Sequence, residues 1–213
     1  MKVLAVGAQK GGVGKTTTSL YLAAHAAAQF GGSRDRPVVG IIDRDESKNL
    51  SELLRLQPDL ARPGVTLLPG EELPGPHCGL QLIVIDTPPG LSAIDSLRQA
   101  HLVLVPVVPD NQGMITLSAY LRNLEVQRIT VSPGMRLVAL LPTMTDHTLL
   151  HRKRIDDLRR IAANRRPPLP VLTPVPRRTR IACWDLDAPE YAAPAKELFD
   201  HAGIVPHAQA VAL

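Results

Sequence analysis

Short apolar runs alternate with helix-length segments along most of the chain. The apolar runs predict strands at residues 2–6, 38–42, 65–68, 82–86, 102–108, 135–141 and 171–175. The segments between them predict helices at residues 15–30, 50–56, 91–100, 111–127, 148–163 and 189–202. We expect Pro106 to interrupt its strand and Pro174 to place the last strand at an edge. The alternation predicts an α/β fold with a mostly parallel central sheet and helices on both faces.

Two of the predicted helices have defined apolar faces. Residues 111–127 offer Ile115, Leu117, Tyr120, Leu121 and Leu124 for burial. Residues 148–163 carry an apolar stripe of Ile155, Leu158 and Ile161, which leaves most of the basic side chains of this segment pointing outward.

Composition indicates a single domain over residues 1–213. This length is enough for a sizeable core, and with 3% aromatic residues that core must consist of Val, Leu, Ile and Ala. We expect no transmembrane helix, because no run of ~18 apolar residues occurs, and the N-terminus lacks a signal-peptide layout. Cys78 and Cys183 are far apart and suggest neither a disulfide framework nor a zinc site, which fits a cytoplasmic protein.

A glycine-rich turn separates the first strand from the first helix. It reads Lys10-Gly11-Gly12-Val13-Gly14-Lys15-Thr16-Thr17. Glycines let successive N–H groups point at an anion, and the helix that follows presents its positive end to the same anion. Lys15 can reach the outer phosphates and the Thr16 hydroxyl can ligate Mg²⁺. The usual phosphate-binding pattern has a glycine at the position of Gln9. This chain lacks that glycine and has an additional lysine, Lys10, at the next position.

Acidic residues follow two of the predicted strands. Asp43 and Asp45 come after residues 38–42, and Asp86 ends the run 82–86. Ligands of open α/β sheets bind at the carboxyl ends of the strands. One carboxylate there can hold the hydration shell of Mg²⁺ while another orients an attacking water.

The net charge of +4 is unevenly distributed. Residues 151–180 contain ten basic and two acidic residues, a local balance of +8, which leaves about −4 for the rest of the chain. One interpretation is a face that binds a polyanion; the other is a solvated helix face with surface ion pairs. The candidate contacts are Arg152, Lys153, Arg154, Arg177, Arg178 and Arg180.

The sequence Lys-Gly-Gly-x-Gly-Lys-Thr-Thr at residues 10–17 resembles the deviant Walker A motif of the ParA/MinD family of P-loop ATPases. This resemblance implies a Mg²⁺-dependent ATPase that forms a nucleotide-sandwich dimer, in which Lys10 reaches the ATP bound by the second subunit. A cation supplied in this way would act like an arginine finger.

The same resemblance assigns roles to residues outside the P-loop. Asp43, Asp45, Asp86, Thr87 and Gly90 match the family's switch regions: Asp45 would activate water, Asp43 and Asp86 would hold Mg²⁺ through water, and Thr87 and Gly90 would lie near the γ-phosphate. The sequence departs from the family at Glu46-Ser47, where Pro-Gln is usual.

Three further residues are candidates for the adenine site by resemblance. They are Thr143, Pro176 and Arg177, although Thr143 can equally be an ordinary loop residue. The helix 111–127 matches the family's dimer helix or simply packs on the sheet. Trp184 is expected in a loop, buried or stacked on the ligand.

Within this family the chain looks most like a small ParA-type partition ATPase, because no domain precedes its first strand. The expected partners are a second copy of the chain, non-specific DNA and a ParB-type centromere-binding protein, with a nucleoid-associated location. A MinD-like membrane-surface ATPase is the alternative, but residues 203–213 lack a basic amphipathic helix. A metabolic P-loop ligase is the third possibility, and Lys10 argues against it.

Overall fold

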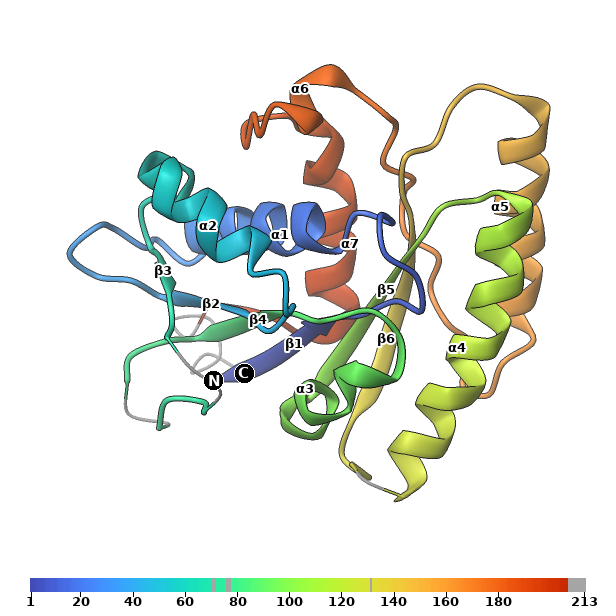
Figure 1. The fold of residues 1–213 in the computed structure, drawn as a ribbon, viewed down its shortest axis with the longest axis horizontal. Helices are drawn as coiled ribbons and strands as arrows, with labels where there is room; N and C mark the ends of the chain where they lie inside the picture. Colours follow the sequence, from blue (N-terminus) through green and yellow to red (C-terminus); the bar gives the residue numbers. More distant parts are fainter. Residues whose placement is uncertain (70–71, 76–77, 131, 207–213) are drawn as a thin grey trace.

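A six-stranded, all-parallel sheet forms the centre of the computed structural model, which describes residues 1–69, 72–75, 78–130 and 132–206 (Figure 1). Its spatial order is β3-β2-β4-β1-β5-β6. Every pair of neighbouring strands runs parallel. The strands are β1 (Lys2–Val6), β2 (Val39–Asp43), β3 (Val65–Leu67), β4 (Leu82–Asp86), β5 (Leu102–Val107) and β6 (Arg136–Pro142). The predicted fold class is therefore confirmed.

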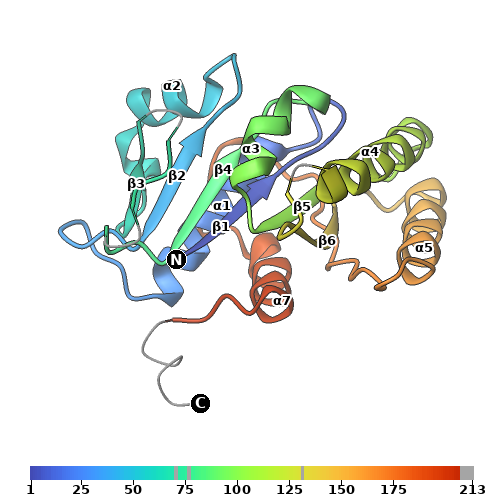
Figure 2. The same cartoon turned by 90° about the horizontal axis from the view of Figure 1, so that it is seen from below.

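Helices cover both faces of the sheet, as the two perpendicular views show (Figures 1 and 2). The helices that pack on one face are α1 (Lys15–Gln29), α2 (Asn49–Leu56) and α7 (Ala192–Ala202). Those on the other face are α3 (Ile94–Gln99), α4 (Asn111–Thr130) and α5 (Leu149–Ala163). The four-residue helix α6 (Thr179–Ala182) and three short turns of 3₁₀ helix at 58–60, 90–93 and 189–191 complete the described elements.

The core is divided by the sheet into two clusters of aliphatic side chains. Along β1, Leu4 and Val6 belong to the cluster under α1, whereas Val3 and Ala5 belong to the cluster under α4. This alternation follows from the two-residue repeat of a strand. Because both faces of the central strands are buried, their sequences are continuously apolar.

The predicted strand at 171–175 is wrong. This segment runs beside β6 but forms only isolated bridges, at Val171 and at Pro176. The cause is the prolines at 170, 174 and 176, which cannot donate to a ladder. Leu172 and Val175 still donate backbone hydrogen bonds toward β6, so the segment is held in an extended course along the sheet.

Pro106 does not interrupt its strand, contrary to expectation. It pairs with Leu141 inside β5, beyond Leu104, where the pairing of β5 with β1 ends. Leu104 accepts from the Gly7 amide on the β1 side, and Pro106, two residues later, faces the same side. Its missing N–H therefore removes no bond from a strand ladder.

Two apolar residues expected in the core are at the surface. Ile115 on α4 is 73% exposed and Ile161 on α5 is 36% exposed, whereas Leu117, Tyr120, Leu121, Leu124 and Leu158 are buried as expected. Within the described ranges, no helix is both long enough and apolar enough to cross a bilayer.

Candidate nucleotide-binding site

The turn between β1 and α1 exposes the backbone N–H groups of the first helical turn. Gly12 and Gly14 have φ of 74° and 87°, a region that glycine reaches without strain. Gly14 is the residue before α1, and neither a side-chain cap nor an acidic residue covers the start of the helix. Its N–H groups and the positive end of the helix are available to an anion.

Lys15 provides the strongest evidence that the turn binds an anion. Only 6% of the residue is exposed, and its amine forms no hydrogen bond or ion pair with any residue that the structure describes. A buried ammonium without a partner is costly. A phosphate group bound at the turn would satisfy it, so the residues present fit such a ligand.

Asp86 provides a second unusual charge beside the turn. It ends β4, is 1% exposed and accepts hydrogen bonds from the Thr16 hydroxyl (2.6 Å) and the Ser19 hydroxyl (3.3 Å). Burial raises the pKa of Asp86 to about 7, with nearby Asp43 adding to the rise while the Thr16 bond and Lys15 oppose it. A divalent cation would stabilise the ionised form, and the adjacent oxygens of Thr16 and Asp86 are of the kind that such a cation prefers.

Asp43 and Asp86 lie opposite each other in the pairing of β2 with β4. The Asp43 carboxylate accepts from the Asp45 amide (3.1 Å) and the Ser51 amide (2.8 Å). The Lys48 ammonium donates to the Asp43 carbonyl (2.8 Å). These bonds fold the loop after β2 over the end of the sheet.

Asp45 is held in that loop by Ser47. Burial alone would raise the pKa of Asp45, but hydrogen bonds from the Ser47 hydroxyl and amide, together with the charges of Lys15 and Lys48, lower it below its ordinary value. Asp45 is therefore ionised at neutral pH and can accept a proton or orient a water.

The loop after β4 is tied to the strand that leads into the glycine-rich turn. The buried Thr87 hydroxyl donates to the Val6 carbonyl (2.9 Å). Gly90 has φ of 65°, lies against Gln9, and donates from its amide to the Ala8 carbonyl (3.0 Å). A displacement of the loop after β4 would therefore be transmitted to the glycine-rich turn through these hydrogen bonds.

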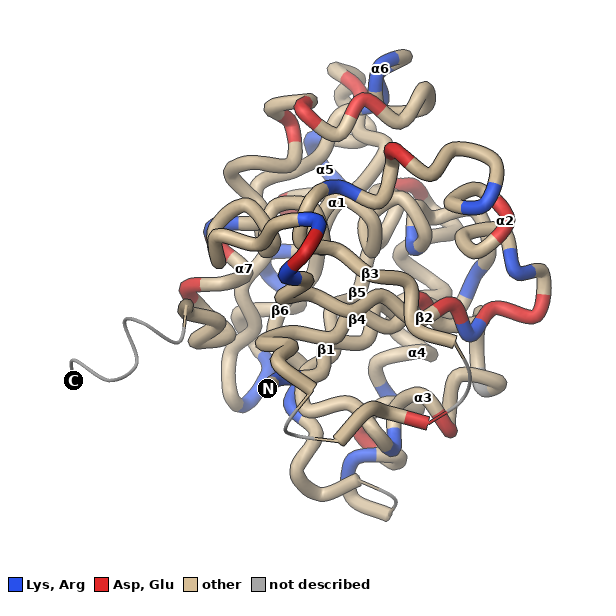
Figure 3. Tube along the Cα trace, turned by 90° about the vertical axis from the view of Figure 1, so that its left-hand side faces the viewer, with Lys and Arg blue, Asp and Glu red and all other residues tan. Residues whose placement is uncertain are grey.

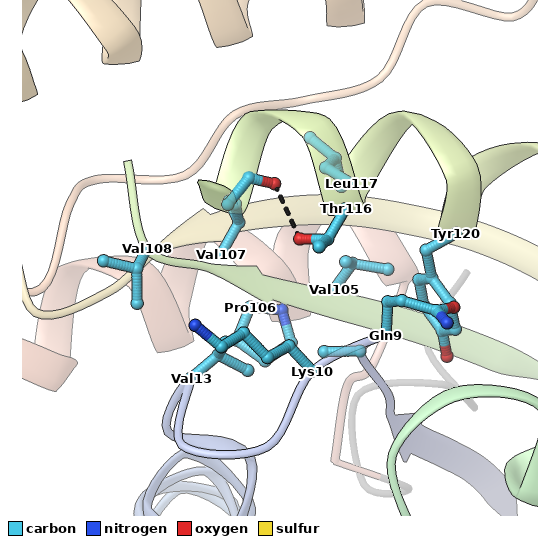
Figure 4. Close-up of a pocket in the computed structure, with 12 residues that line it drawn as sticks. Gln9, Lys10, Val13, Val105, Pro106, Val107, Val108, Thr116, Leu117 and Tyr120 are labelled. Carbon is cyan, nitrogen blue, oxygen red and sulfur yellow. Dashed lines mark hydrogen bonds between the residues drawn. The ribbon is translucent and has the colours of Figure 1, made fainter. Parts of the chain in front are cut away.

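Lys10 points away from the turn toward α4. Its ammonium donates to the Gln112 side chain at 2.9 Å. Figure 4 shows Gln9, Lys10 and Val13 facing β5 and the first turns of α4, with the Gln9 amide beside the Tyr120 ring. In the single chain Lys10 is thus turned toward its own α4, and its predicted reach into a second subunit remains a prediction.

A hollow of about 420 Å³ opens on the other side of the turn. It brings together the P-loop residues Gly14 and Thr17 and all three candidate adenine contacts. The lining is Gly14, Thr17, Thr143, Met144, Val175, Pro176, Arg177, Arg178, Ile181, Ala182, Trp184 and Tyr191. The Thr143 hydroxyl, however, donates to the Val13 carbonyl (2.9 Å), so it supports the P-loop backbone. Trp184 is partly buried, with φ of 62°.

The candidate cations for polyanion binding are divided between α5 and residues 177–180, which lead into and begin α6. Arg154 is paired with Asp157 and bonded to Asn111, while Arg178 and Arg180 are paired with Glu190. Arg152, Lys153 and Arg177 are exposed and form no ion pair with another described residue. The start of α5 and the segment that leads into α6 lie at the end of the sheet that carries the glycine-rich turn (Figure 1).

Elsewhere the charges are mixed. On the face that carries α1 and α2, segments with Lys or Arg lie next to segments with Asp or Glu (Figure 3). The pairs Arg34–Asp59 and Arg55–Glu52 are examples.

Comparison with known proteins identifies the family. Residues 4–188 match the model of the CobQ/CobB/MinD/ParA nucleotide binding domain. The chain belongs to this family. It is 30% identical to the chromosome-partitioning ATPase Soj of Thermus thermophilus, over 97% of this chain and 91% of that relative.

Several solved structures have a similar fold. The Mycobacterium smegmatis cobyrinic acid a,c-diamide synthase with bound ADP and magnesium has a TM-score of 0.69 and 25% identity, covering 97% of this chain and 98% of that one. The ATP complex of a Cyanothece McdA variant has a TM-score of 0.71 at 18% identity, covering 96% and 97%, and supports the fold alone. The same holds for the MinC:MinD complex of Aquifex aeolicus, with a TM-score of 0.71 at 16% identity, covering 95% and 96%.

Several residues of the site were missed from the sequence, among them Ser19, Ser47, Gln112 and Tyr191. Ser19 is one helical turn after Thr16, so its position facing Asp86 could have been inferred from helical spacing. Ser47 follows Asp45 by two residues, the spacing of a local side-chain-to-backbone turn. Gln112 and Tyr191 gave no local signal, because only the tertiary fold brings them to the turn.

Proposed function

We propose that this chain is a partition ATPase that hydrolyses ATP with Mg²⁺ and uses ATP to control its binding to itself and to DNA. The observation that carries the proposal is the 30% identity to a partitioning ATPase over nearly the whole chain. Lys15, which is buried without a partner among the described residues, and the two carboxylates at the ends of β2 and β4 support it.

The chain's own residues would divide the work as follows. The N–H groups of residues 11–17 and Lys15 would bind the phosphates, and Thr16, Asp43 and Asp86 would hold the magnesium shell, the aspartates through water. Asp45 would orient the attacking water. Pro176, Arg177 and the rest of the 420 Å³ hollow would receive the adenine. Magnesium would supply positive charge against the phosphate oxygens.

Two copies would close face to face around nucleotide. Lys10 would leave Gln112 and contact the phosphates bound by the partner subunit, which makes hydrolysis depend on dimerisation. Thr87 and Gly90 would report the γ-phosphate through their bonds to the chain before the P-loop.

The dimer would bind DNA without sequence preference. Arg152, Lys153 and Arg177 are the candidate cations most available to phosphate groups, because each is exposed and forms no ion pair with a described residue. Two such faces in one dimer engage DNA together, so the second face binds at high effective concentration. A ParB-type partner would then stimulate hydrolysis and release the dimer, which would be cytoplasmic and associated with the nucleoid.

The test is DNA binding by gel shift with ATP, ADP or no nucleotide, over a range of salt concentrations. We expect binding with ATP only, falling steeply with salt. Changing Arg152→Gln and Lys153→Gln together should weaken it and reduce the salt slope by about two per chain.

The matched control is Arg34→Gln with Arg36→Gln, which removes the same charge from the exposed loop before β2. It should leave DNA affinity unchanged. Equal affinity of the Arg152/Lys153 variant and the wild type would refute the assignment of the face to α5. Binding to anionic vesicles in place of DNA would favour the MinD-like alternative, and ATP-dependent binding to neither would favour a metabolic ligase.

A further inference from the structure

One oxygen of the Asp45 carboxylate is held by a single residue. Asp45 Oδ1 accepts the Ser47 amide at 3.0 Å and the Ser47 hydroxyl at 2.7 Å. Asp45 Oδ2 accepts no hydrogen bond from a described residue. Two donors on one oxygen restrict rotation of the carboxylate, so the free oxygen has a defined direction.

The rest of the loop is fixed independently of that hydroxyl. Asp43 accepts from the Asp45 and Ser51 amides, and Lys48 donates to the Asp43 carbonyl. The backbone of Asp45 is therefore anchored through Asp43. What remains to be fixed is the side chain of Asp45, and Ser47 does this.

We propose that Ser47 is a positioning residue for hydrolysis: its hydroxyl anchors Asp45 Oδ1 and so presents Oδ2 to the attacking water. The inference rests on the proposed function, in which Asp45 orients that water. Small displacements of a catalytic group reduce rate strongly.

The hydrogen bond from Ser47 to Asp45 offers a physical account of why this chain can have Glu46-Ser47 where the family usually has Pro-Gln. A proline at position 46 would restrict the backbone of Asp45 from the following residue. Glu46 imposes no such restriction. The hydroxyl of Ser47 supplies a restraint of another kind, applied directly to the carboxylate.

A purely structural role for Ser47 would be to cap the helix that follows. The structure shows no such cap: α2 begins at Asn49 after Lys48, without a side-chain cap bond. Among described residues, the Ser47 hydroxyl bonds only to Asp45. Ser47 is also exposed, so replacing it should not disturb folding.

The experiment compares Ser47→Ala, Ser47→Thr and Asp45→Ala with the wild type. ATP affinity is measured by titration and kcat and KM by phosphate release. Ser47→Ala should lower kcat about tenfold, the rate equivalent of one hydrogen bond to a charged group, with ATP affinity and KM unchanged. Ser47→Thr keeps the hydroxyl and should restore most of kcat.

Ser33→Ala is the matched control. Its hydroxyl likewise makes a local hydrogen bond in an exposed loop, but it accepts the Arg36 amide at 3.2 Å and lies outside the site. It should behave as the wild type.

Two results would overturn the inference about Ser47 and leave the proposed function standing. One is normal kcat in Ser47→Ala while Asp45→Ala has lost hydrolysis. The other is a loss of kcat in Ser47→Ala that Ser47→Thr does not restore. Normal hydrolysis in Asp45→Ala would instead refute the role of Asp45, on which both proposals depend.

Discussion

At the scale of single residues, the sequence located the P-loop motif. It did not reveal how deeply the charged side chains at the motif are buried or which partners they have. The pattern around Lys15 predicts phosphate binding. That Lys15 is buried without a described partner, and that burial raises the pKa of Asp86 to about 7, depends on the packing of α1 against β4. For Thr143 the sequence predicted the place but not the contact. The residue lines the hollow proposed for adenine, yet its hydroxyl donates to the P-loop backbone at Val13.

Trp184 is the residue that can report on the hollow directly. It is the single tryptophan of the chain, and it lines the space proposed for adenine. ATP and ADP should both change its fluorescence, because they share the base. Trp184→Ala should weaken ATP binding by about 1–3 kcal/mol, the range measured for stacking of a base on an aromatic side chain.

Inorganic triphosphate provides the control for Trp184, because it engages the P-loop without a base. Its affinity should be the same for the wild type and Trp184→Ala. An unchanged tryptophan emission at ATP concentrations where calorimetry shows binding would place the base elsewhere.

At the scale of elements, apolar runs located the six strands with small errors at their ends. The one false strand, at 171–175, has an apolar pattern typical of a strand, but its prolines deprive it of a ladder. Among the helices, the sequence identified most of the apolar positions that face the core but wrongly included Ile115 and Ile161. On α4 the buried side chains at 117, 120, 121 and 124 have helical spacing, while Ile115 lies outside that face.

Helix α1 carries a pH-dependent contribution to stability at His25. Burial lowers the pKa of His25 below 6.5, with Asp187 opposing the shift, and its Nε2 has no partner among the described residues. A histidine with a lowered folded pKa stabilises the fold above the unfolded pKa. That stability is lost as pH falls, because the unfolded chain takes up the proton first.

We therefore expect the free energy of unfolding to fall between pH 7 and 5.5 with a contribution from His25 of at most about 1.4 kcal/mol per pH unit. His25→Leu cannot titrate and should flatten this part of the profile. Denaturant unfolding at several pH values measures both slopes. Identical slopes for the two proteins would exclude His25 as their cause.

At the scale of the whole molecule, alternation of strands and helices predicted a parallel sheet, and the structure confirms it. The strand order could not be read from the alternation, since many orders are compatible with the same sequence of elements. That order nevertheless creates the site, because it sets β4 between β2 and β1 and so brings Asp43 and Asp86 to the start of α1.

The proposed dimer gives a prediction about assembly and rate together. Asp45→Ala should bind ATP without hydrolysing it, and in analytical ultracentrifugation with ATP and Mg²⁺ it should sediment as a dimer. With ADP it should sediment as a monomer. A monomer under both conditions would contradict the sandwich arrangement.

Lys10 distinguishes this dimer from a simple association of two independent active sites. If the partner subunit's lysine completes each site, the specific activity of the wild type must rise with protein concentration. Lys10→Ala should bind ATP normally but lose partner-stimulated hydrolysis, on the order of a thousandfold if it acts like an arginine finger. Lys15→Ala, by contrast, should lose nucleotide binding itself. Full stimulated turnover in Lys10→Ala would mean that its contact with Gln112 is its lasting position and that each chain hydrolyses ATP alone.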